Sequence, residues 1–265
     1  MTDGVARDRP LLEVIALGPA DAVAAEDGGA DRIELVASID ADGLSPEPSL
    51  VESIRRRTSI PIRVMLRLND SFVTTPAELA RLRGLAIDYS RAGADGFVLG
   101  FLTPTLEVDV AATMALVEGL HGMPWTFHRA IDHALDVEQA WRSLRNLPGL
   151  TEVLTAGSAR GMDHGVDEVI RLAQADAEVA SRTMAGGGLR AEHVPWLAQA
   201  GVRAFHVGRS ARHDQSWKAY VDPAYVRAWR TLIDHEVERA RALGRETGTP
   251  EARGTDPATR ETDPV

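Results

Sequence analysis

Eight short apolar runs, each followed by a segment with helical periodicity, are the feature that most constrains the fold of this chain. The runs fall at 11–16, 32–36, 62–66, 96–99, 125–128, 152–155, 183–185 and 204–207. Helical patterns follow them at 19–27, 49–57, 76–92, 109–120, 137–146, 167–177, 191–200 and 223 to about 242. Such alternation predicts a parallel sheet, and eight repeats predict a closed (β/α)8 TIM barrel with the helices outside.

Glycines at three helix-to-strand junctions support the parallel sheet. Gly29, Gly93 and Gly201 each end a helical pattern just before an apolar run. Glycine accepts the left-handed conformation that commonly closes a helix. An open, doubly wound sheet is the alternative architecture, but no glycine-rich dinucleotide fingerprint follows the first strand.

The chain is predicted to form one domain. Barrels of roughly 200–250 residues commonly fold as single domains, so we assign 11–243 to one barrel. Residues 1–10 are polar and charged, and we expect them to be flexible. Residues 244–265 are rich in Gly, Pro, Thr and charge, without hydrophobic periodicity, which predicts a disordered tail.

Composition restricts location and partners. No apolar run approaches the roughly 18–20 residues that span a bilayer, and the polar N-terminus shows no secretory leader. The net charge of −10 disfavours a nucleic-acid surface. We therefore expect a cytoplasmic protein without membrane or nucleic-acid partners. Four tryptophans in helical or loop segments could anchor a homodimer or pack the core: Trp141, Trp196, Trp217 and Trp229.

Two scarce residue types exclude several chemistries. The sequence contains no cysteine, which excludes a thiol nucleophile, an iron–sulfur cluster and a thiolate site for Cu(I). Its one lysine, Lys218, lies beyond the last strand-like run. A Schiff-base aldolase needs a lysine on a barrel strand, so that mechanism is not expected.

Polar residues lie where the predicted strands deliver side chains to the mouth of the barrel. In this fold, catalytic side chains project from the carboxyl ends of the strands. Glu34 or His128 could act as a general base, while Arg67 and Arg129 could hold negative charge. If a divalent metal is bound, His128, Glu13 and Glu34 are the candidate ligands. The candidate catalytic residues are Glu13, Glu34, Arg67, His128, Arg129 and Asp132.

A purely structural interpretation of these charges stays open. Carboxylates inside strands also occur as halves of buried ion pairs, for which Arg32, Arg63 and Arg67 are available. In that case the buried charges would only fix the strand register of a non-catalytic scaffold.

Glycine-rich segments after the seventh and eighth strands suggest an anion site. Backbone N–H groups at such turns bind phosphate or carboxylate in many barrels. Tight turns with solvated arginines are the alternative. The candidate anion-binding residues are Thr155, Gly157, Gly186, Gly187, Gly188, His206, Gly208, Arg209 and Ser210.

Several short segments, in the same order, make the chain resemble the CutC family of copper-homeostasis proteins. They lie at 12–14, 29–35, 43–46, 60–62, 65–67, 126–132, 154–157 and 184–188. The resemblance covers about 11–218 and implies a TIM-barrel-like fold, a cytoplasmic location and a site at the strand carboxyl ends. It places Glu13, Glu34, Arg67, His128 and Asp132 at family positions.

The chain departs from the family pattern where that pattern commonly has cysteine. Val14, Ile15 and Val36 stand at those places, and soft thiolates are the ligands that select Cu(I). Two functions are therefore expected beside the scaffold interpretation. One is the copper-homeostasis role that the resemblance implies. The other is lyase- or isomerase-type acid–base chemistry on a small anionic, phosphorylated or sugar-like substrate.

Overall fold

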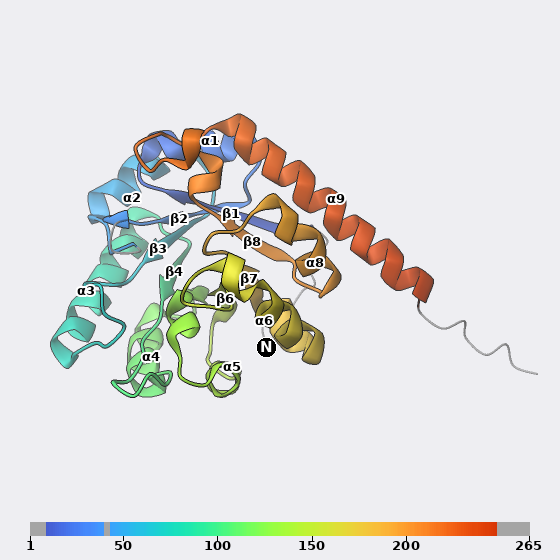
Figure 1. Ribbon diagram of the computed structural model, residues 1–265. Coiled ribbons are helices and arrows are strands. Elements are labelled where there is room, and N and C mark those ends of the chain that lie inside the picture. The colour runs from blue at the N-terminus through green and yellow to red at the C-terminus, as the bar shows by residue number, and fades with distance from the viewer. Residues whose placement is uncertain (1–8, 40–42, 248–265) are drawn as a thin grey trace, which may run out of the picture.

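The computed structural model describes residues 9–39 and 43–247, and eight parallel strands in these ranges close into a barrel (Figure 1). Each strand pairs with its neighbours in sequence, and the eighth pairs with the first. The predicted (β/α)8 fold is therefore confirmed. The strands are β1 (Leu11–Ala16), β2 (Arg32–Leu35), β3 (Ile62–Met65), β4 (Gly96–Leu99), β5 (Trp125–Phe127), β6 (Leu150–Thr155), β7 (Thr183–Ala185) and β8 (Ala204–Val207).

Helices surround the barrel (Figure 1). They are α1 (Pro19–Gly28), α2 (Pro48–Arg55), α3 (Pro76–Ala92), α4 (Val110–Val117), α5 (Val137–Leu144), α6 (Met162–Ala175), α7 (Ala177–Arg182), α8 (Val194–Gln199) and α9 (Pro223–Thr247). Short 3-10 turns, among them η3 (Arg129–His133) and η5 (Arg209–Ala211), follow β5 and β8. Two helices replace the single one expected at 167–177, because the Asp176 side chain caps a new helix by accepting from the N–H groups of Glu178 and Val179.

Local sequence signals set the helix ends. Thr75 and Glu78 form a reciprocal capping box at the start of α3. The predicted glycine turns are present at Gly29, Gly93 and Gly201, whose φ angles are 88°, 103° and 97°. These left-handed turns return the chain from helix to strand at the amino-terminal face of the barrel.

The last helix is longer than expected. α9 continues to Thr247 rather than ending near residue 242, so the predicted tail boundary at 244 is wrong by four residues. The rest of that tail, like residues 1–8 of the expected flexible N-terminus, lies outside the described residues. None of the helices within 9–39 and 43–247 has the length and apolar character needed to cross a lipid bilayer.

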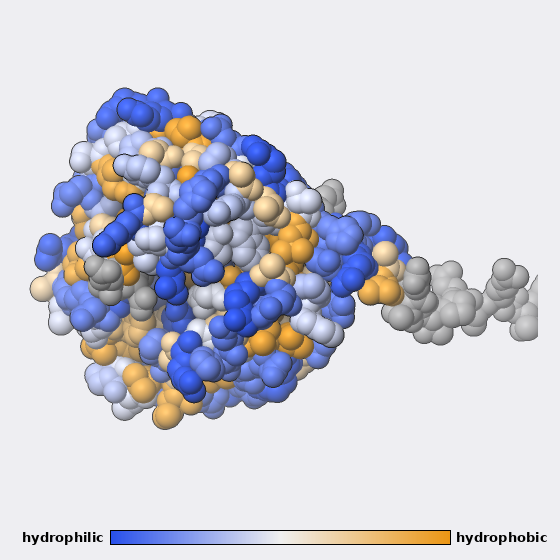
Figure 2. All heavy atoms as spheres, turned by 45° about the horizontal axis from the view of Figure 1, so that its top comes forward, coloured by the Kyte–Doolittle hydropathy of each residue, from blue (hydrophilic) through white to orange (hydrophobic). Residues whose placement is uncertain are grey.

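Hydrophilic residues cover much of the face shown in Figure 2, and apolar residues form separate patches there. The tryptophans proposed as dimer anchors differ in exposure. Trp141 and Trp229 belong to the core, Trp217 is half-buried, and Trp196 on α8 is 62% exposed. Trp196 is therefore the one of the four that a partner molecule could reach most fully.

A buried ion pair ties the segment after β8 to the first helix. Arg212 donates from Nη2 to Asp21 Oδ2 at 2.7 Å and from Nη1 to the carbonyl oxygen of Ala219 at 2.6 Å. Asp21 also accepts from the backbone N–H groups of Leu17 and Val221. Both charged side chains are almost fully buried, so each depends on the other for charge compensation.

We expect Asp21→Ala to lower the free energy of unfolding by about 3–5 kcal/mol, because it leaves the Arg212 guanidinium buried without its counter-charge. Urea or guanidinium unfolding measures the loss. Asp27→Ala, an exposed change on the same helix, is the matched control and should stay within about 0.5 kcal/mol of the parent. A loss below about 1 kcal/mol for Asp21→Ala would place the pair among weak surface salt bridges and contradict this assignment.

Candidate functional site

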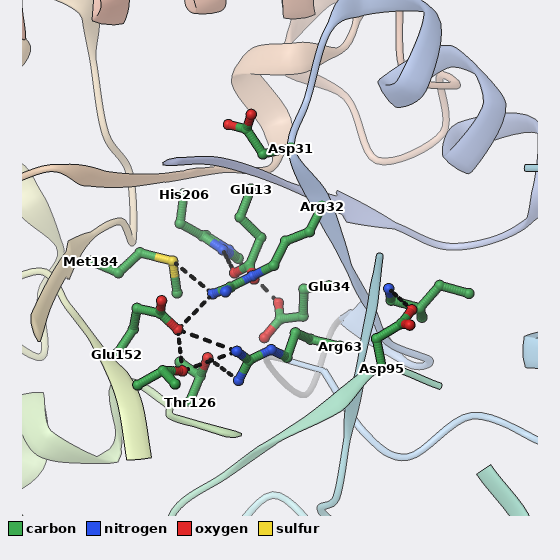
Figure 3. A network of polar contacts seen from close by, with 12 residues as sticks. Glu13, Asp31, Arg32, Glu34, Arg63, Asp95, Thr126, Glu152, Met184 and His206 are labelled. Carbon is green, nitrogen blue, oxygen red and sulfur yellow. Dashed lines mark hydrogen bonds and ion pairs between the residues drawn. The ribbon is translucent and has the colours of Figure 1, made fainter. Parts of the chain in front are cut away.

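The centre of the barrel holds a network of charged side chains instead of an apolar core (Figure 3). Arg32 on β2 donates from Nε to Glu13 Oε2 at 2.5 Å and from Nη2 to Glu152 Oε2 at 3.0 Å. Arg63 on β3 lies 3.5 Å from the same Glu152 oxygen and donates to Thr151 Oγ1 at 2.9 Å. Two guanidinium groups and two carboxylates thus neutralise each other inside the barrel.

His206 extends this network toward the carboxyl end of β2. Its Nδ1 lies 2.8 Å from Glu13 Oε1, and its Nε2 lies 3.7 Å from Glu34 Oε2. The other oxygen of Glu34, Oε1, is buried and has no hydrogen-bond partner among the described residues. Glu34 therefore differs from Glu13 and Glu152, which are both held by arginine.

The environment separates the pKa values of these carboxyl groups. Burial opposes ionisation of Glu13, but the charge of Arg32 and the hydrogen bond with His206 outweigh it and lower its pKa to about 2. Burial dominates at Glu34 and raises its pKa to about 7. The pKa of His206 is raised, because its bond to Glu13 and the nearby Glu34 carboxyl outweigh the effect of burial. Glu34 therefore changes its charge near neutral pH, beside an imidazole whose pKa is shifted toward the protonated form.

His128 points into the barrel from the end of β5. Side chains two residues apart on a strand share a face, and Thr126 lies in the central network, 3.5 Å from Arg63 Nη1. The His128 Nδ1 accepts from the backbone N–H of Ala130 at 3.2 Å. Its Nε2 is buried without a hydrogen-bond partner in the described part of the chain. Burial, followed by the charge of Arg67, lowers the pKa of the imidazole to about 3, so His128 is neutral.

Asp132 is fully occupied by internal hydrogen bonds. Its side chain accepts from Thr155 Oγ1 at 2.5 Å, from the N–H of Ala156 at 3.0 Å and from the N–H of Gly157 at 3.2 Å. Arg129 Nε adds a fourth donor at 2.8 Å. Thr155 and Gly157, predicted to bind an external anion, thus hold the carboxylate of Asp132, and they fasten η3 to the loop after β6.

Arg129 connects three loops. Besides Asp132, its guanidinium contacts the carbonyl oxygens of Ser158 and Ala159. Gly187 in the loop after β7 has a φ angle of 74°, which favours glycine, and a Cβ atom there would lie 2.5 Å from Arg129 Nε. The following Gly188 is exposed. The geometry gives Arg129 and Gly187 packing roles.

Glycines in the upper barrel wall let neighbouring side chains approach the backbone closely. A Cβ at Gly186 would lie 2.6 Å from Leu154 and 3.0 Å from the Cβ of His206. At Gly208 it would lie 2.6 Å from the Trp217 ring, and at Gly100 2.6 Å from His128 Nδ1. Val36, Met65 and Val98 form an apolar cluster at the ends of β2, β3 and β4.

The remaining predicted residues lie at the rim. Arg67 donates to the carbonyl oxygen of Asp70 at 2.6 Å and packs 4.8 Å from the centre of the Phe72 ring. Arg209 is exposed, and Ser210 is half-buried in η5. The structure thus brings Glu13, Glu34 and His206 into direct contact, and it places Arg209 outside that group.

The sequence interpretation missed Glu152, which carries the charge balance of the network. The sixth strand was expected to start at residue 152, and Glu152 was not among the candidate residues. The strand starts at Leu150, and the period-two alternation from there directs Glu152 inward. The signal was present, because Glu152 stands in an apolar run as Glu13 and Glu34 do.

Comparison with known proteins assigns the chain to a family. A sequence profile of the CutC family matches residues 11–211. The chain belongs to the CutC family. A CutC family protein of Xanthomonas campestris pv. campestris is 36% identical over 217 residues, which span 81% of this chain and 89% of the relative. A second, from Klebsiella pneumoniae, is 33% identical over 198 residues, spanning 74% of this chain and 78% of the relative.

Solved structures agree with the fold. A CutC crystal structure from Streptococcus agalactiae, provisionally described as a copper homeostasis protein, matches with a TM-score of 0.67 and 25% identity, covering 75% of this chain and 98% of that chain. A 4-hydroxy-tetrahydrodipicolinate synthase from Methylacidiphilum fumariolicum matches with a TM-score of 0.60 and 18% identity over 89% of this chain and 77% of its own. The second match shows the fold alone.

The donor atoms of this CutC family member do not fit a Cu(I) site. The sequence has no cysteine. The two methionines of the barrel interior lie in separate apolar clusters, Met65 with Val36 and Val98, and Met184 with Leu11 and Leu154. Across residues 9–39 and 43–247, no three His, Asp or Glu side chains gather as metal ligands would. Glu13, one of the predicted ligands, is already bonded to Arg32 and His206.

The raised pKa of Glu34 predicts a pH-dependent contribution to stability. Between its ordinary value of 4.5 and about 7, native Glu34 keeps a proton that the unfolded chain has released, so this contribution to the unfolding free energy falls as pH rises. Glu34→Gln cannot titrate and should remove this contribution. Urea unfolding of both proteins across this window measures the difference in slope.

Glu52→Gln, which replaces an exposed carboxylate on α2, is the matched control and should reproduce the parent slope. Identical slopes in all three proteins would show that Glu34 does not retain a proton in this window.

We further expect no tight Cu(I) binding, because the chain lacks thiolates and keeps its two inner thioethers apart. Titration against a chromogenic Cu(I) chelator under reducing, anaerobic conditions tests this. Retention of one Cu(I) per chain at sub-micromolar free copper would contradict it.

Proposed function

We propose that this CutC family member is a barrel enzyme that transfers a proton on a small molecule bound at the carboxyl ends of the strands. The chemistry is of the lyase or isomerase type, and Glu34 is the group that carries the proton. The single observation behind the proposal is the Glu34 carboxyl group, which is buried, titrates near neutral pH and has one oxygen, Oε1, without a partner in the described residues.

A structural role alone accounts poorly for this group. A buried polar atom without a hydrogen bond costs about 1–3 kcal/mol. The network beneath Glu34 is already neutral, because Arg32 and Arg63 balance Glu13 and Glu152. Glu34 is therefore not needed to balance the two arginines, and its ion-pair contact is with His206. Buried carboxyl groups whose pKa is moved toward neutrality are typical of acid–base sites.

The proposed proton transfer balances without an added cofactor. Ionised Glu34 accepts a proton from a carbon next to a carbonyl group and becomes a neutral carboxyl group. The electron pair of that C–H bond delocalises onto the carbonyl oxygen as an enolate. If the deprotonated carbon carries a hydroxyl group, its O–H proton moves to the enolate oxygen, the carbonyl forms at that carbon, and Glu34 returns its proton to the former carbonyl carbon. If the next carbon carries a leaving group, the enolate electrons expel it and Glu34 donates the proton to it. His206, held by Glu13, offers a second proton position 3.7 Å away.

Deuterium exchange in D2O tests this proposal without knowledge of the physiological substrate. The probes are pyruvate, glyceraldehyde and dihydroxyacetone, together with the phosphates of the last two, followed by proton NMR. We expect the parent protein to exchange deuterium for the hydrogen on the carbon next to the carbonyl group of at least one probe. Glu34→Gln should slow that exchange by about 10²–10⁴-fold, as loss of a general base does.

Glu52→Gln serves again as the control and should exchange at the parent rate. Thermal unfolding of Glu34→Gln, expected at or above the parent temperature, separates loss of function from loss of fold. Lack of exchange with every probe, or equal exchange by the parent and Glu34→Gln, would overturn the proposal.

A further inference from the structure

We infer that His128 donates its Nε2–H to an uncharged oxygen of the substrate, and that the site thereby selects small neutral carbonyl compounds over their phosphorylated forms. The inference rests on the function proposed above and adds a second reacting residue and a substrate class. It makes His128 a hydrogen-bond donor and leaves the role of base to Glu34.

The contacts of the imidazole ring fix where its proton lies. The backbone N–H of Ala130 donates to Nδ1 at 3.2 Å, so Nδ1 is an acceptor and the proton of the neutral ring is on Nε2. Nε2 is buried and meets no acceptor among the described residues. His128 is 4% exposed, so bulk water has little access to the Nε2–H as a hydrogen-bond acceptor. An acceptor atom supplied by a ligand would satisfy this donor.

The position of the ring is constrained on two further sides. The Phe72 ring centre lies 5.5 Å from that of His128. Gly100 passes so close to Nδ1 that a Cβ there would lie 2.6 Å away. Such a preorganised neutral donor stabilises the negative charge that develops on a carbonyl oxygen when a proton leaves the adjacent carbon. Burial and the charge of Arg67 keep the ring neutral by lowering its pKa.

The part of the expected anion cradle that follows β6 is already used by the protein itself. The hydroxyl of Thr155 and the N–H groups of Ala156 and Gly157 hold the Asp132 carboxylate. Arg129 donates to the same carboxylate. A phosphate group at this part of the mouth would therefore have to displace an internal carboxylate that receives four donors.

The buried cation after β8 is also paired within the protein. Arg212 is buried against Asp21. Arg209 and Arg160 are exposed at the rim, where a charge pairs weakly. The inner surface offers the apolar cluster of Val36, Met65 and Val98 instead. These apolar side chains and the His128 donor favour a compact ligand with a neutral polar end.

The experiment compares dihydroxyacetone with dihydroxyacetone phosphate, and glyceraldehyde with its 3-phosphate, in the same deuterium-exchange assay. We expect kcat/KM for the neutral member of at least one pair to exceed that of its phosphate by about tenfold or more. His128→Leu removes the donor and should lower the exchange rate by about a hundredfold. His128→Gln keeps an N–H donor and should recover part of kcat.

A measurement that needs no substrate accompanies the assay. Nitrogen-15 NMR of the histidine rings should show His128 as the neutral Nε2–H tautomer throughout the neutral pH range. Thermal unfolding should show that His128→Leu stays close to the parent, because loss of a buried donor without a partner offsets loss of the acceptor for the Ala130 N–H.

The outcomes separate the two proposals. If Glu34→Gln abolishes exchange while His128→Leu retains the parent rate, the role of His128 is overturned and the proposed function stands. A tautomer with the proton on Nδ1, or a preference for the phosphates in both pairs, also overturns the inference. If the parent exchanges none of the probes, the proposed function fails and this inference fails with it.

Discussion

The double contact of Arg32 with Glu13 and Glu152 is the interaction on which the barrel interior depends. A guanidinium group removed from water requires counter-charges at hydrogen-bonding distance, and here β1 and β6 supply one each. Arg32 and Glu13 are direct partners in the β1–β2 register. A slip by one residue would turn one of them away from the barrel axis. The buried charges are therefore neutralised only when the strands pair in the correct register.

This arrangement also determines why Glu34 is different. Once Arg32 and Arg63 have neutralised Glu13 and Glu152, no ion pair with an arginine is left for Glu34 among the residues that the structure describes. Ionised Glu34 then needs a protonated His206, and protonated Glu34 is compatible with a neutral His206. Both states leave the interior with the same net charge. The interior therefore keeps its net charge when a proton moves between the two groups, which favours their use as an acid–base pair.

Much of this could be predicted from the sequence, and the failures have specific physical causes. Alternating apolar runs located the strands, because their two-residue period decides which side chains face the barrel axis. The partner of Asp132 could not be predicted in this way. It is bound by the N–H groups of Ala156 and Gly157, and sequence patterns do not encode the conformation that turns loop amides toward one carboxylate. A carboxylate and a glycine-rich turn were consequently predicted as separate parts of a ligand site, although they bind each other.

Two residues of the segment after β5, His128 and Asp132, have different roles. Asp132 already accepts four hydrogen bonds and its side chain is fully buried, so it has little capacity left to act as a base. Its bonds instead hold η3 against the loop after β6. The same turn supplies Ala130, whose N–H fixes the His128 ring. Rigid support of this kind is what a reacting group needs in order to be held in one geometry. In the proposed reaction, the Asp132 carboxylate would thus act indirectly, by fixing the backbone between Asp132 and His128. The imidazole keeps a donor, Nε2, without a partner among the described residues.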